Sequence, residues 1–400
     1  MDFSCVIWYK SDMQTYDVII IGAGAAGLRA ARACVGMGRR TLILDMGDAI
    51  ARKVRVSGGG RCNITNAAAA RDRYFGQNPD FVRSALAAVT PDDILDWAAA
   101  HHLPLIEKAP GQYFCADGAT AVVGALGDDA RGTDILSNTC VTDMDRTGDT
   151  FRIHTDRGDM AAPRVIIATG GVSYPNLGVS DIGYKIAKKF GHKIVPPRPG
   201  LVALDTDAVP ADLAGIGWDV QIHIGRHHIT DAMMFRHHGI GGPAAYRASL
   251  YDLNDGITID LLPGASADQW LRTAKQTSPK KSIQSILAQK FPARMAAWLY
   301  PDKNTRIAEV SNKILEQIAA SVHKFYIPGD RLRRAGFSGA EVTYGGVDTA
   351  DISSKTMESK LCPGLFFAGE VLDITGDLGG FNLHFAWASG TIAGRNAAQA

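Results

Sequence analysis

The stretch DVIIIGAGAAGLRAARACVGMGRRTLILD, residues 17–45, decides the fold of this chain. An apolar run at 18–21 predicts a strand that leads into Gly22, Gly24 and Gly27, spaced G-x-G-x-x-G. A helical stretch rich in Ala, Leu and Arg follows, and a second apolar strand at 42–44 ends in Asp45. This order of strand, glycine turn, helix, strand and acid is typical of a dinucleotide-binding βαβ unit.

Each glycine of the fingerprint has its own mechanical role. Gly22 permits the tight turn off the strand, Gly24 leaves room for a pyrophosphate, and Gly27 lets the helix pack close to the sheet. The first helical turn offers unpaired N–H groups and a positive dipole end to phosphates, and the acid is placed to accept hydrogen bonds from a ribose. A glycine-rich turn without a ligand would not explain all of these parts together. The predicted contacts are Gly22, Gly24, Ala25, Ala26, Gly27 and Asp45.

A second glycine-rich segment, RKVRVSGGGRCN, occupies residues 52–63. Three consecutive glycines are unfavourable in a helix or strand because each carries a large entropic cost. We therefore expect a loop that lines a ligand, in preference to the alternative of a flexible surface linker. The predicted ligand contacts in it are Lys53, Ser57, Gly58, Gly59, Gly60, Arg61, Cys62 and Asn63.

The remaining sequence predicts an α/β domain interrupted by an insertion. The proline-rich run PPRPG at 196–200 indicates a stiff connection and a domain boundary. Short alternating strands follow, then helical patterns, and nucleotide-domain sequence returns near the end. We expect an N-terminal extension at 1–15, a dinucleotide domain at 16–195 and 348–400, an inserted antiparallel β domain at 196–262 and 332–347, and a helical subdomain at 263–331.

Composition narrows the possible partners and sites. The 400 residues carry a net charge of +1, which gives no reason to expect a nucleic acid or another polyanion as partner. The N-terminus lacks the features of a secretory signal, and no run of 18 apolar residues is present, so we expect a cytoplasmic protein without a membrane partner. The six cysteines form no C-x-x-C, and neighbouring histidines in the three His-His pairs would point to opposite faces of a strand, so no metal site is expected.

Seven motifs together resemble one family, the BaiN-like (YhiN-like) NAD(P)/FAD-dependent oxidoreductases of bacteria. They are IIIGAGAAGL (19–28), RKVRVSGGGRCNITN (52–66), ATGGVSYP (168–175), HHGIGGP (237–243), TMESK (356–360), GLFFAGEVLD (364–373) and GGFNLHFAWASGTIAG (379–394). The resemblance implies FAD as cofactor, in a two-dinucleotide-binding flavoprotein fold with an inserted β domain and a helical subdomain. The family pattern is not kept at Arg236, Gly241 and His384, where the family usually shows Thr, Ser and Gln, and its usual Gly-Asp-Gly reads Asp181-Ile182-Gly183 here.

If FAD is the ligand, two turns near the end of the chain are expected to contact it. Glu370 would face the pyrophosphate or ribitol, and the turn before the last helix would offer N–H groups to negative charge on the reduced flavin. The alternative for Glu370 and Asn382 is the capping of local turns. The resemblance also suggests backbone near Val141 against the adenine. The further predicted contacts are Val141, Ala168, Thr169, Gly170, Gly171, Gly369, Glu370, Gly380, Phe381 and Asn382.

The sequence gives fewer signals for the residues that act on the substrate than for those that bind the cofactor. Tyr174 and His238 lie in motif turns and are the candidate catalytic proton donors, although the ring of Tyr174 could instead pack and bond locally. No second strand–GxGxxG–helix is present, so NAD(P)H, if it is the electron donor, would dock only transiently.

Three functions follow from this pattern. The main prediction is an NAD(P)H-dependent reductase of a small, enone-like substrate. The second is an amine or aminoketone oxidase that uses oxygen. The third is a flavin-containing protein that binds or modifies RNA or another macromolecule, which the neutral charge disfavours. We accordingly expect a small-molecule substrate and no nucleic acid, and the sequence leaves the oligomeric state open.

Overall fold

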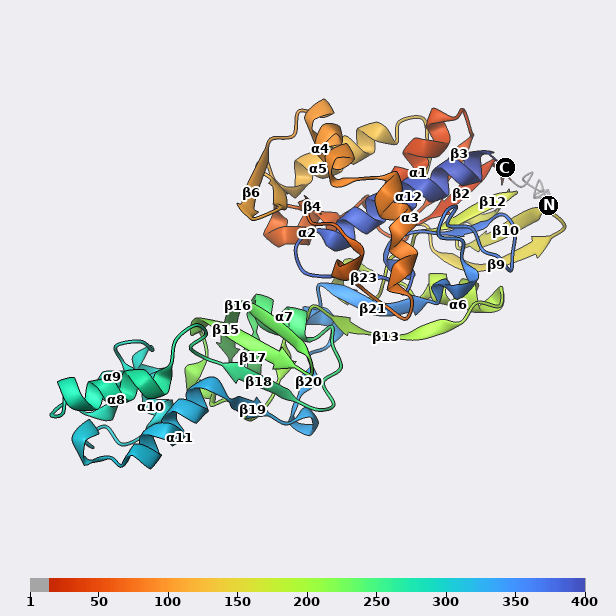
Figure 1. Ribbon diagram of the computed structural model, residues 1–400. Coiled ribbons are helices and arrows are strands. Elements are labelled where there is room, and N and C mark those ends of the chain that lie inside the picture. The colour runs from red at the N-terminus through yellow and green to blue at the C-terminus, as the bar shows by residue number, and fades with distance from the viewer. Residues whose placement is uncertain (1–13, 400) are drawn as a thin grey trace, which may run out of the picture. The chain divides into compact units, whose positions relative to one another are not determined.

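The computed structural model describes residues 14–399 and divides them into two compact units (Figure 1). The first unit contains the chain up to Arg198 and again from Thr343, and the second contains Pro199–Val342. Each unit has its own hydrophobic core. Of the predicted N-terminal extension, residues 1–13 lie outside the described residues, while Gln14–Thr15 forms strand β1.

A five-stranded parallel sheet forms the centre of the first unit, in the order β22-β12-β2-β3-β8. These strands are Leu365–Phe367, Arg164–Ile167, Val18–Ile21, Thr41–Leu44 and Asp134–Leu136. The four segments VIII, TLIL, RVII and LFF are almost wholly buried, as expected of parallel strands covered on both faces. The strand order reverses between β2 and β12, so the carboxyl ends of these strands open the crevice where such folds bind ligands.

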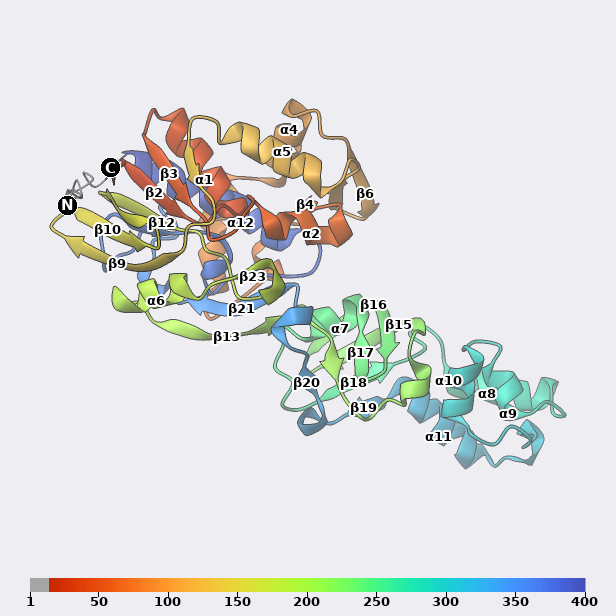
Figure 2. The ribbon, with the colours of Figure 1, turned by 180° about the vertical axis from the view of Figure 1, so that it is seen from behind.

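Two helices from opposite ends of the sequence pack tightly beside this sheet. They are α1 (Ala25–Gly36) and α12 (Phe381–Gln399), which Figures 1 and 2 both show side by side. A Cβ on Gly390 would lie 2.2 Å from the Ala26 carbonyl oxygen, and one on Gly394 would lie 2.3 Å from that of Ala30. Glycine at these two positions therefore permits the close approach of the helices.

Smaller elements complete the first unit. A four-stranded sheet has the order β1-β11-β10-β9, a three-stranded sheet the order β4-β7-β6, and β13 pairs with β21 and β5 with β23. The strands are β4 Asn63–Asn66, β5 Tyr74–Phe75, β6 Leu105–Ala109, β7 Gln112–Cys115, β9 Val141–Thr147, β10 Thr150–Thr155, β11 Gly158–Ala162, β13 Ile194–Gly200, β21 Val342–Val347 and β23 Thr375–Gly376. The helices are α2 Arg52–Gly60, α3 Val82–Ala88, α4 Pro91–Ala100, α5 Ala119–Asp129 and α6 Ile182–Lys189.

The second unit is an antiparallel sheet with helices that share its core. The strand order is β19-β18-β15-β16-β17-β14-β20. The strands are β14 Leu204–Asp205, β15 Gly217–Ile224, β16 His227–Arg236, β17 Gly239–Gly241, β18 Ile257–Asp260, β19 Phe325–Ile327 and β20 Arg333–Arg334, and the helices are α7 Gly242–Ala248, α8 Ala267–Thr277, α9 Ile283–Leu287, α10 Ala293–Leu299 and α11 Asn312–His323. The segments for which the sequence predicts a β domain and a helical subdomain contribute to one hydrophobic cluster, and Thr343–Val347 lies in the first unit.

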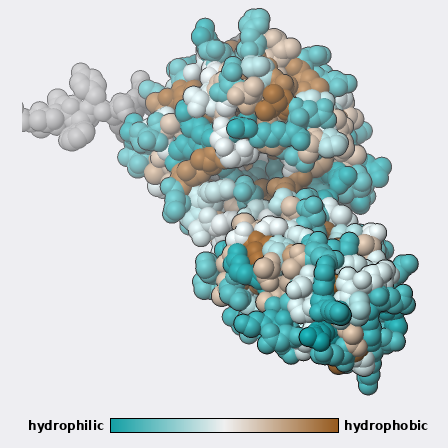
Figure 3. All heavy atoms as spheres, turned by 90° about the vertical axis from the view of Figure 1, so that its left-hand side faces the viewer, coloured by the Kyte–Doolittle hydropathy of each residue, from teal (hydrophilic) through white to brown (hydrophobic). Residues whose placement is uncertain are grey.

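On the face shown in Figure 3, hydrophilic residues predominate and hydrophobic ones occur in small separate groups. Within residues 14–399 no helix combines the length and apolar character needed to cross a membrane. The same residues contain no group of three or more His, Cys, Asp or Glu arranged to hold a metal ion.

Candidate functional site

The three fingerprint glycines differ in their surroundings. Gly22 has a φ of +113°, and a Cβ there would lie 2.3 Å from the Ala168 carbonyl oxygen. A Cβ on Gly27 would lie 1.9 Å from the carbonyl oxygen of Gly22. A Cβ on Gly24 would have no atom of the described chain within 4 Å beyond its own neighbours. Gly22 and Gly27 thus serve the packing of strand and helix, whereas Gly24 faces open space.

The helix N-terminus beside this space offers donors. Gly24 is the N-cap of α1, and no side chain caps the helix there. The amides of Ala25 and Ala26 open the helix, where the dipole favours an anion. Open space next to uncapped amides fits a pyrophosphate, as the sequence predicts.

Asp45 follows β3 and is held at the edge of this space. Its carboxylate accepts hydrogen bonds from the amides of Ala23 and Gly47, both at 2.7 Å, and lies 3.3 Å from Arg52 Nη2. A carboxylate offers about four acceptor positions, so a ribose hydroxyl can still bind. The Thr139 amide donates to the Asp45 carbonyl at 2.9 Å, which brings the chain just before Val141 beside the same residue.

The triple-glycine segment interrupts α2 as a left-handed turn. Ser57 is extended, with a ψ of 147°, and Gly58 and Gly59 have φ values of +57° and +65°. A Cβ on Gly58 would lie 2.9 Å from the Asn63 amide nitrogen. Gly59 and Gly60, in contrast, would meet no atom of the described chain within 4 Å. One side of this loop is therefore packed and the other is open, as the proposed ligand-lining role requires.

The residues after this loop have different environments. Arg61 is exposed. The Cys62 thiol is fully buried, and burial raises its pKa to about 12, so it remains protonated. The Asn63 amide, oriented to satisfy its neighbours, donates to the carbonyls of Thr65 and Tyr113 and accepts from the Gly380 amide. Asn63 thereby ties this loop to the turn that begins α12.

A half-buried ion pair joins α2 to the turn after β22. Lys53 Nζ lies 2.7 and 2.8 Å from the two carboxylate oxygens of Glu370 and 2.5 Å from Ser173 Oγ. Glu370 Oε1 also accepts from the Thr343 amide at 2.7 Å. Tyr174 has a left-handed φ of +57°, and its ring centre lies 5.9 Å from Lys53 Nζ. The structure thus places the candidate proton donor Tyr174 next to a fixed positive charge.

The ATGG segment after β12 and the turn after β22 lie at the same sheet edge. Gly170 and Gly369 have φ values of +72° and +75°. A Cβ on Gly171 would lie 2.3 Å from Thr343 Oγ1, and Gly183 brings α6 close to Thr169 in the same way. Only glycine at these turns lets the chain pass so closely.

The turn that begins α12 is closely packed. A Cβ on Gly380 would lie 2.7 Å from the Thr65 carbonyl oxygen. The Asn382 side chain accepts from the Gly376 amide at 2.8 Å and donates to the Gly376 carbonyl at 2.9 Å. The side-chain amide of Asn382 therefore fixes a local turn.

Some residues of this region were missed from the sequence. Thr343 Oγ1 accepts from the amides of Val172 and Ser173 at 2.8 and 3.0 Å, yet it stands at the end of the insertion without any motif. Ser173 lies in the ATGGVSYP motif, which is a signal that could have been used. His384 is fully buried between Thr65 Oγ1 at 2.8 Å and the Val89 carbonyl at 3.0 Å. Burial lowers its pKa to about 4, so it is a neutral structural link.

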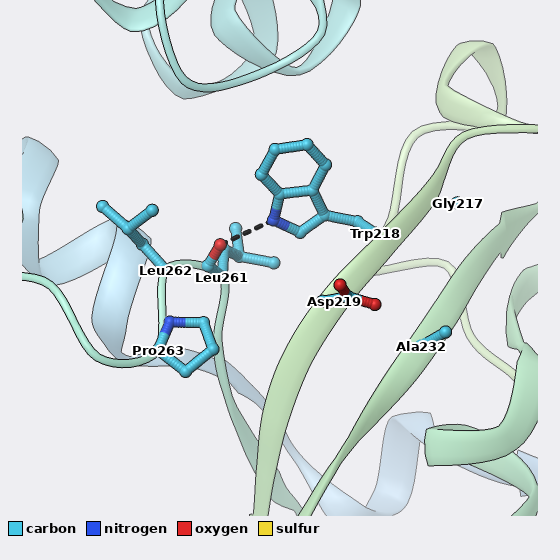
Figure 4. A pocket seen from close by; sticks show the side chains of 7 residues that line it. All are labelled: Gly217, Trp218, Asp219, Ala232, Leu261, Leu262 and Pro263. Atoms are coloured by element: carbon cyan, nitrogen blue, oxygen red, sulfur yellow. Dashed lines mark hydrogen bonds between the residues drawn. The ribbon is translucent and has the colours of Figure 1, made fainter. Parts of the chain in front are cut away.

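The second candidate proton donor, His238, lies elsewhere. It occupies the exposed turn between β16 and β17 in the second unit, whereas Tyr174 belongs to the first unit. A hollow of about 500 Å³ in the same unit is lined by Trp218 and Asp219, among others. Figure 4 shows the indole reaching from its strand toward Leu261, whose carbonyl accepts its N–H at 2.6 Å. No sequence-predicted site residue lines this hollow.

Three characterised relatives match nearly the whole chain. The Ribosomal RNA dihydrouridine synthase of Haemophilus influenzae is 38% identical over 93% of this chain and 96% of its own. The Ribosomal RNA dihydrouridine synthase of Escherichia coli is 36% identical over 94% of this chain and 96% of its own. The 3-dehydro-bile acid delta(4,6)-reductase of Clostridium scindens is 32% identical over 95% of this chain and 98% of its own.

Solved structures share the fold at low identity. The 3-ketosteroid delta1-dehydrogenase of Sterolibacterium denitrificans has a TM-score of 0.53 at 12% identity and covers 97% of this chain and 100% of its own. The 3-ketosteroid-delta4-(5alpha)-dehydrogenase of Rhodococcus jostii RHA1 has a TM-score of 0.50 at 14% identity and covers 98% of both chains. These likenesses confirm the predicted α/β flavoprotein fold with inserted antiparallel strands.

The relatives confirm one functional prediction and overturn another. The chain is a FAD-dependent reductase, as the main prediction states at this level. The expectation of no nucleic-acid partner is wrong, because two relatives of almost the same length carry the name of a ribosomal RNA enzyme. That expectation rested on a net charge close to zero, which describes the whole chain and not the distribution of charge within it. The relatives therefore favour the RNA-modifying alternative over a small-molecule substrate.

The resemblance carried by the seven motifs is also confirmed. The family model described as HI0933-like protein Rossmann domain matches residues 16–396. Because this match covers nearly the whole chain, the protein belongs to the HI0933-like family of flavoproteins.

Proposed function

We propose that this protein reduces uridine to dihydrouridine in ribosomal RNA, with FAD as cofactor and NAD(P)H as the source of electrons. The observation that carries the proposal is the identity of 38% and 36% to two ribosomal RNA dihydrouridine synthases, over more than nine-tenths of each chain. A cytoplasmic location, where ribosomal RNA is available, belongs to the same proposal.

The residues of the crevice fit FAD. The open space at Gly24 and the amides of Ala25 and Ala26 would hold the pyrophosphate, and Asp45 the ribose. The open sides of Gly59 and Gly60 leave room for a flat ring system. When bound, FAD supplies a hydride for the substrate double bond. In this assignment the predicted contacts in the 52–63, 168–171, 369–370 and 380–382 segments line the cofactor.

The reaction needs a hydride at uridine C6 and a proton at C5, which together saturate the C5–C6 bond. We assign the proton to Tyr174 Oη, because this residue follows the ATGG turn at the crevice and lies beside Lys53. The ammonium group of Lys53 is fixed by Glu370 and Ser173, so it presents positive charge where the phenol loses its proton. Tyr174 is then reprotonated from solvent.

The test uses purified holoenzyme, NADH or NADPH, and unmodified ribosomal RNA transcripts under anaerobic conditions. Nucleoside mass spectrometry should detect dihydrouridine only when enzyme, nicotinamide and RNA are all present. Tyr174→Phe should lower the rate by about a hundredfold and keep flavin absorbance, in line with the usual contribution of a general acid. RNA that stays unmodified while either nicotinamide bleaches the flavin would reject the RNA substrate. A flavin that neither nicotinamide reduces would reject the electron donor.

A reductase of small enone-like substrates is the second candidate. The 32% identity to the 3-dehydro-bile acid delta(4,6)-reductase over 95% of this chain supports it. A 3-oxo-Δ4 steroid offers a double bond conjugated to a carbonyl, as the uracil ring does. Turnover of such a steroid with no dihydrouridine formed on RNA would favour this second function.

A further inference from the structure

The net charge of +1 conceals an uneven distribution. Residues 263–331 hold eleven Lys and Arg against five Asp and Glu, whereas the rest of the chain holds 31 against 36. The segment with α8 to α11 is therefore distinctly basic and the remainder acidic. A local excess of positive charge is what a polyanionic partner recognises.

Several of these cations are already engaged within the protein. Arg272 pairs with Asp268 and Glu316, and Arg331 pairs with Asp207. Three others contact carbonyl oxygens or a ring: Lys275, Lys290 and Arg294. These side chains stabilise the unit and are poor candidates for binding a partner.

Four of the remaining cations lie on two adjoining segments and on the loop that precedes the second of them. The Ile307 amide donates to the Lys281 carbonyl at 2.9 Å, the Ile283 amide donates to the Thr305 carbonyl at 3.1 Å, and Ser282 bridges to Arg306. Segments 279–283 and 305–308 thus run antiparallel side by side. Two lysines lie on the first segment, one arginine lies on the second, and one lysine lies on the loop before the second. We call these four residues the basic tip: Lys280, Lys281, Lys303 and Arg306.

The side chains of the basic tip are exposed and uncommitted. All four are exposed, and within residues 14–399 none forms an ion pair. The two nearest carboxylates in the sequence are engaged: Asp302 accepts from the Asn304 amide and the Thr305 hydroxyl, and Glu309 accepts from the Arg306 amide. The cluster therefore presents positive charge to solvent without an internal partner.

We propose that the basic tip binds the phosphate backbone of the ribosomal RNA substrate, an inference that rests on the proposed function. Lysine and arginine on an exposed rim contact phosphates without reading bases, so the tip provides affinity and orientation while other residues select the uridine. Because the four charges are exposed to solvent, we expect the binding to depend strongly on salt.

The experiment compares RNA binding by the holoenzyme and three variants. The first is K280Q/K281Q/K303Q/R306Q. The second, K280R/K281R/K303R, keeps the charge of the tip. The third, R157Q/K188Q/K355Q/R395Q, removes four exposed cations of the first unit as a matched control. The probes are small- and large-subunit ribosomal RNA transcripts, and flavin absorbance and the unfolding temperature check that each variant is folded.

The glutamine variant should bind RNA about tenfold more weakly at moderate salt, and its slope of log affinity against log salt should be shallower by roughly three. The arginine variant and the control should stay within about twofold of the original protein. Equal binding and equal slope in the glutamine variant would overturn the inference, as would an equal loss in the control.

Dihydrouridine formation separates this inference from the proposed function. If the original protein forms dihydrouridine and the glutamine variant binds RNA equally well, the role of the tip is wrong and the function stands. If the original protein binds RNA through the tip but forms no dihydrouridine, the RNA surface stands and the reaction is wrong. If the original protein binds no ribosomal RNA at all, the inference is rejected.

Discussion

Gly24 and Gly27 are three residues apart, yet a side chain at each would have opposite consequences. At Gly24 an added side chain enters open space, so the variant Gly24→Val should fold and fail to retain FAD. We expect a colourless purified protein whose unfolding free energy lies within about 1 kcal/mol of the FAD-free original protein. Flavin absorbance and denaturant unfolding measure both. A yellow Gly24→Val protein would contradict the placement of the pyrophosphate.

Gly27→Val is the matched comparison. Its Cβ would collide with the Gly22 carbonyl oxygen at 1.9 Å, so the helix must move away from the strand. Overpacking of this kind typically costs about 1–3 kcal/mol or more. We expect the FAD-free form of this variant to unfold at clearly lower denaturant concentration than that of Gly24→Val, although both lie in one motif.

His384 makes stability depend on pH. Its pKa of about 4 in the folded protein lies below the value of about 6.5 for an unfolded histidine, so unfolding takes up a proton between these values. The stabilisation is complete above pH about 6.5 and is lost as the pH falls toward about 4, by roughly 3 kcal/mol. His384→Gln stays neutral, so its unfolding free energy should decline less over this window. Parallel pH profiles for the two proteins, from chemical denaturation, would contradict this role.

At the scale of elements, the contact between α1 and α12 depends on glycine. Gly390→Ala places a Cβ 2.2 Å from the Ala26 carbonyl oxygen, and we expect a loss of about 1–3 kcal/mol. Gly36→Ala is the control, because a Cβ there meets no atom of the described chain within 4 Å. Gly36→Ala should leave the free energy of unfolding unchanged or raise it by up to about 1 kcal/mol. Thermal unfolding of both variants checks whether packing or helix propensity decides.

Local patterns made much of the first unit predictable. The fingerprint from Val18 to Asp45 predicts its strands, turn and helix, because each of these elements depends on residues close in sequence. The partners of Glu370 could not be predicted in this way. Lys53, Ser173 and Thr343 come from segments far apart in the sequence, and only the folded chain brings them to one carboxylate. For Asn382, the local-cap alternative describes what its side chain does.

At the scale of the whole molecule, the net charge of the chain conceals an uneven distribution of charge along it. A net charge of +1 is compatible with a basic segment balanced by an acidic remainder, which is what the chain contains. The expectation of no nucleic acid rested on this average, and the two ribosomal RNA enzymes among the relatives contradict it. The excess at 263–331 emerges when charge is counted separately over each predicted subdomain, because the acidic remainder no longer cancels it.

The two units have separate hydrophobic cores, which predicts their unfolding behaviour. No residue is shared between the core of the first unit and that of the second among the described residues. We therefore expect two transitions in calorimetry of the FAD-free protein. Since the proposed FAD site lies in the first unit, FAD at about a hundredfold over its dissociation constant should stabilise that transition alone, by about 2.7 kcal/mol. Phe235→Ala is the complementary change. The Phe235 ring is buried in the core of the second unit, and its centre lies 6.2 Å from the centre of the Trp298 ring. It should lower the other transition by about 3–5 kcal/mol and leave FAD binding intact. A single transition that both FAD and Phe235→Ala displace would show that the units fold as one cooperative body.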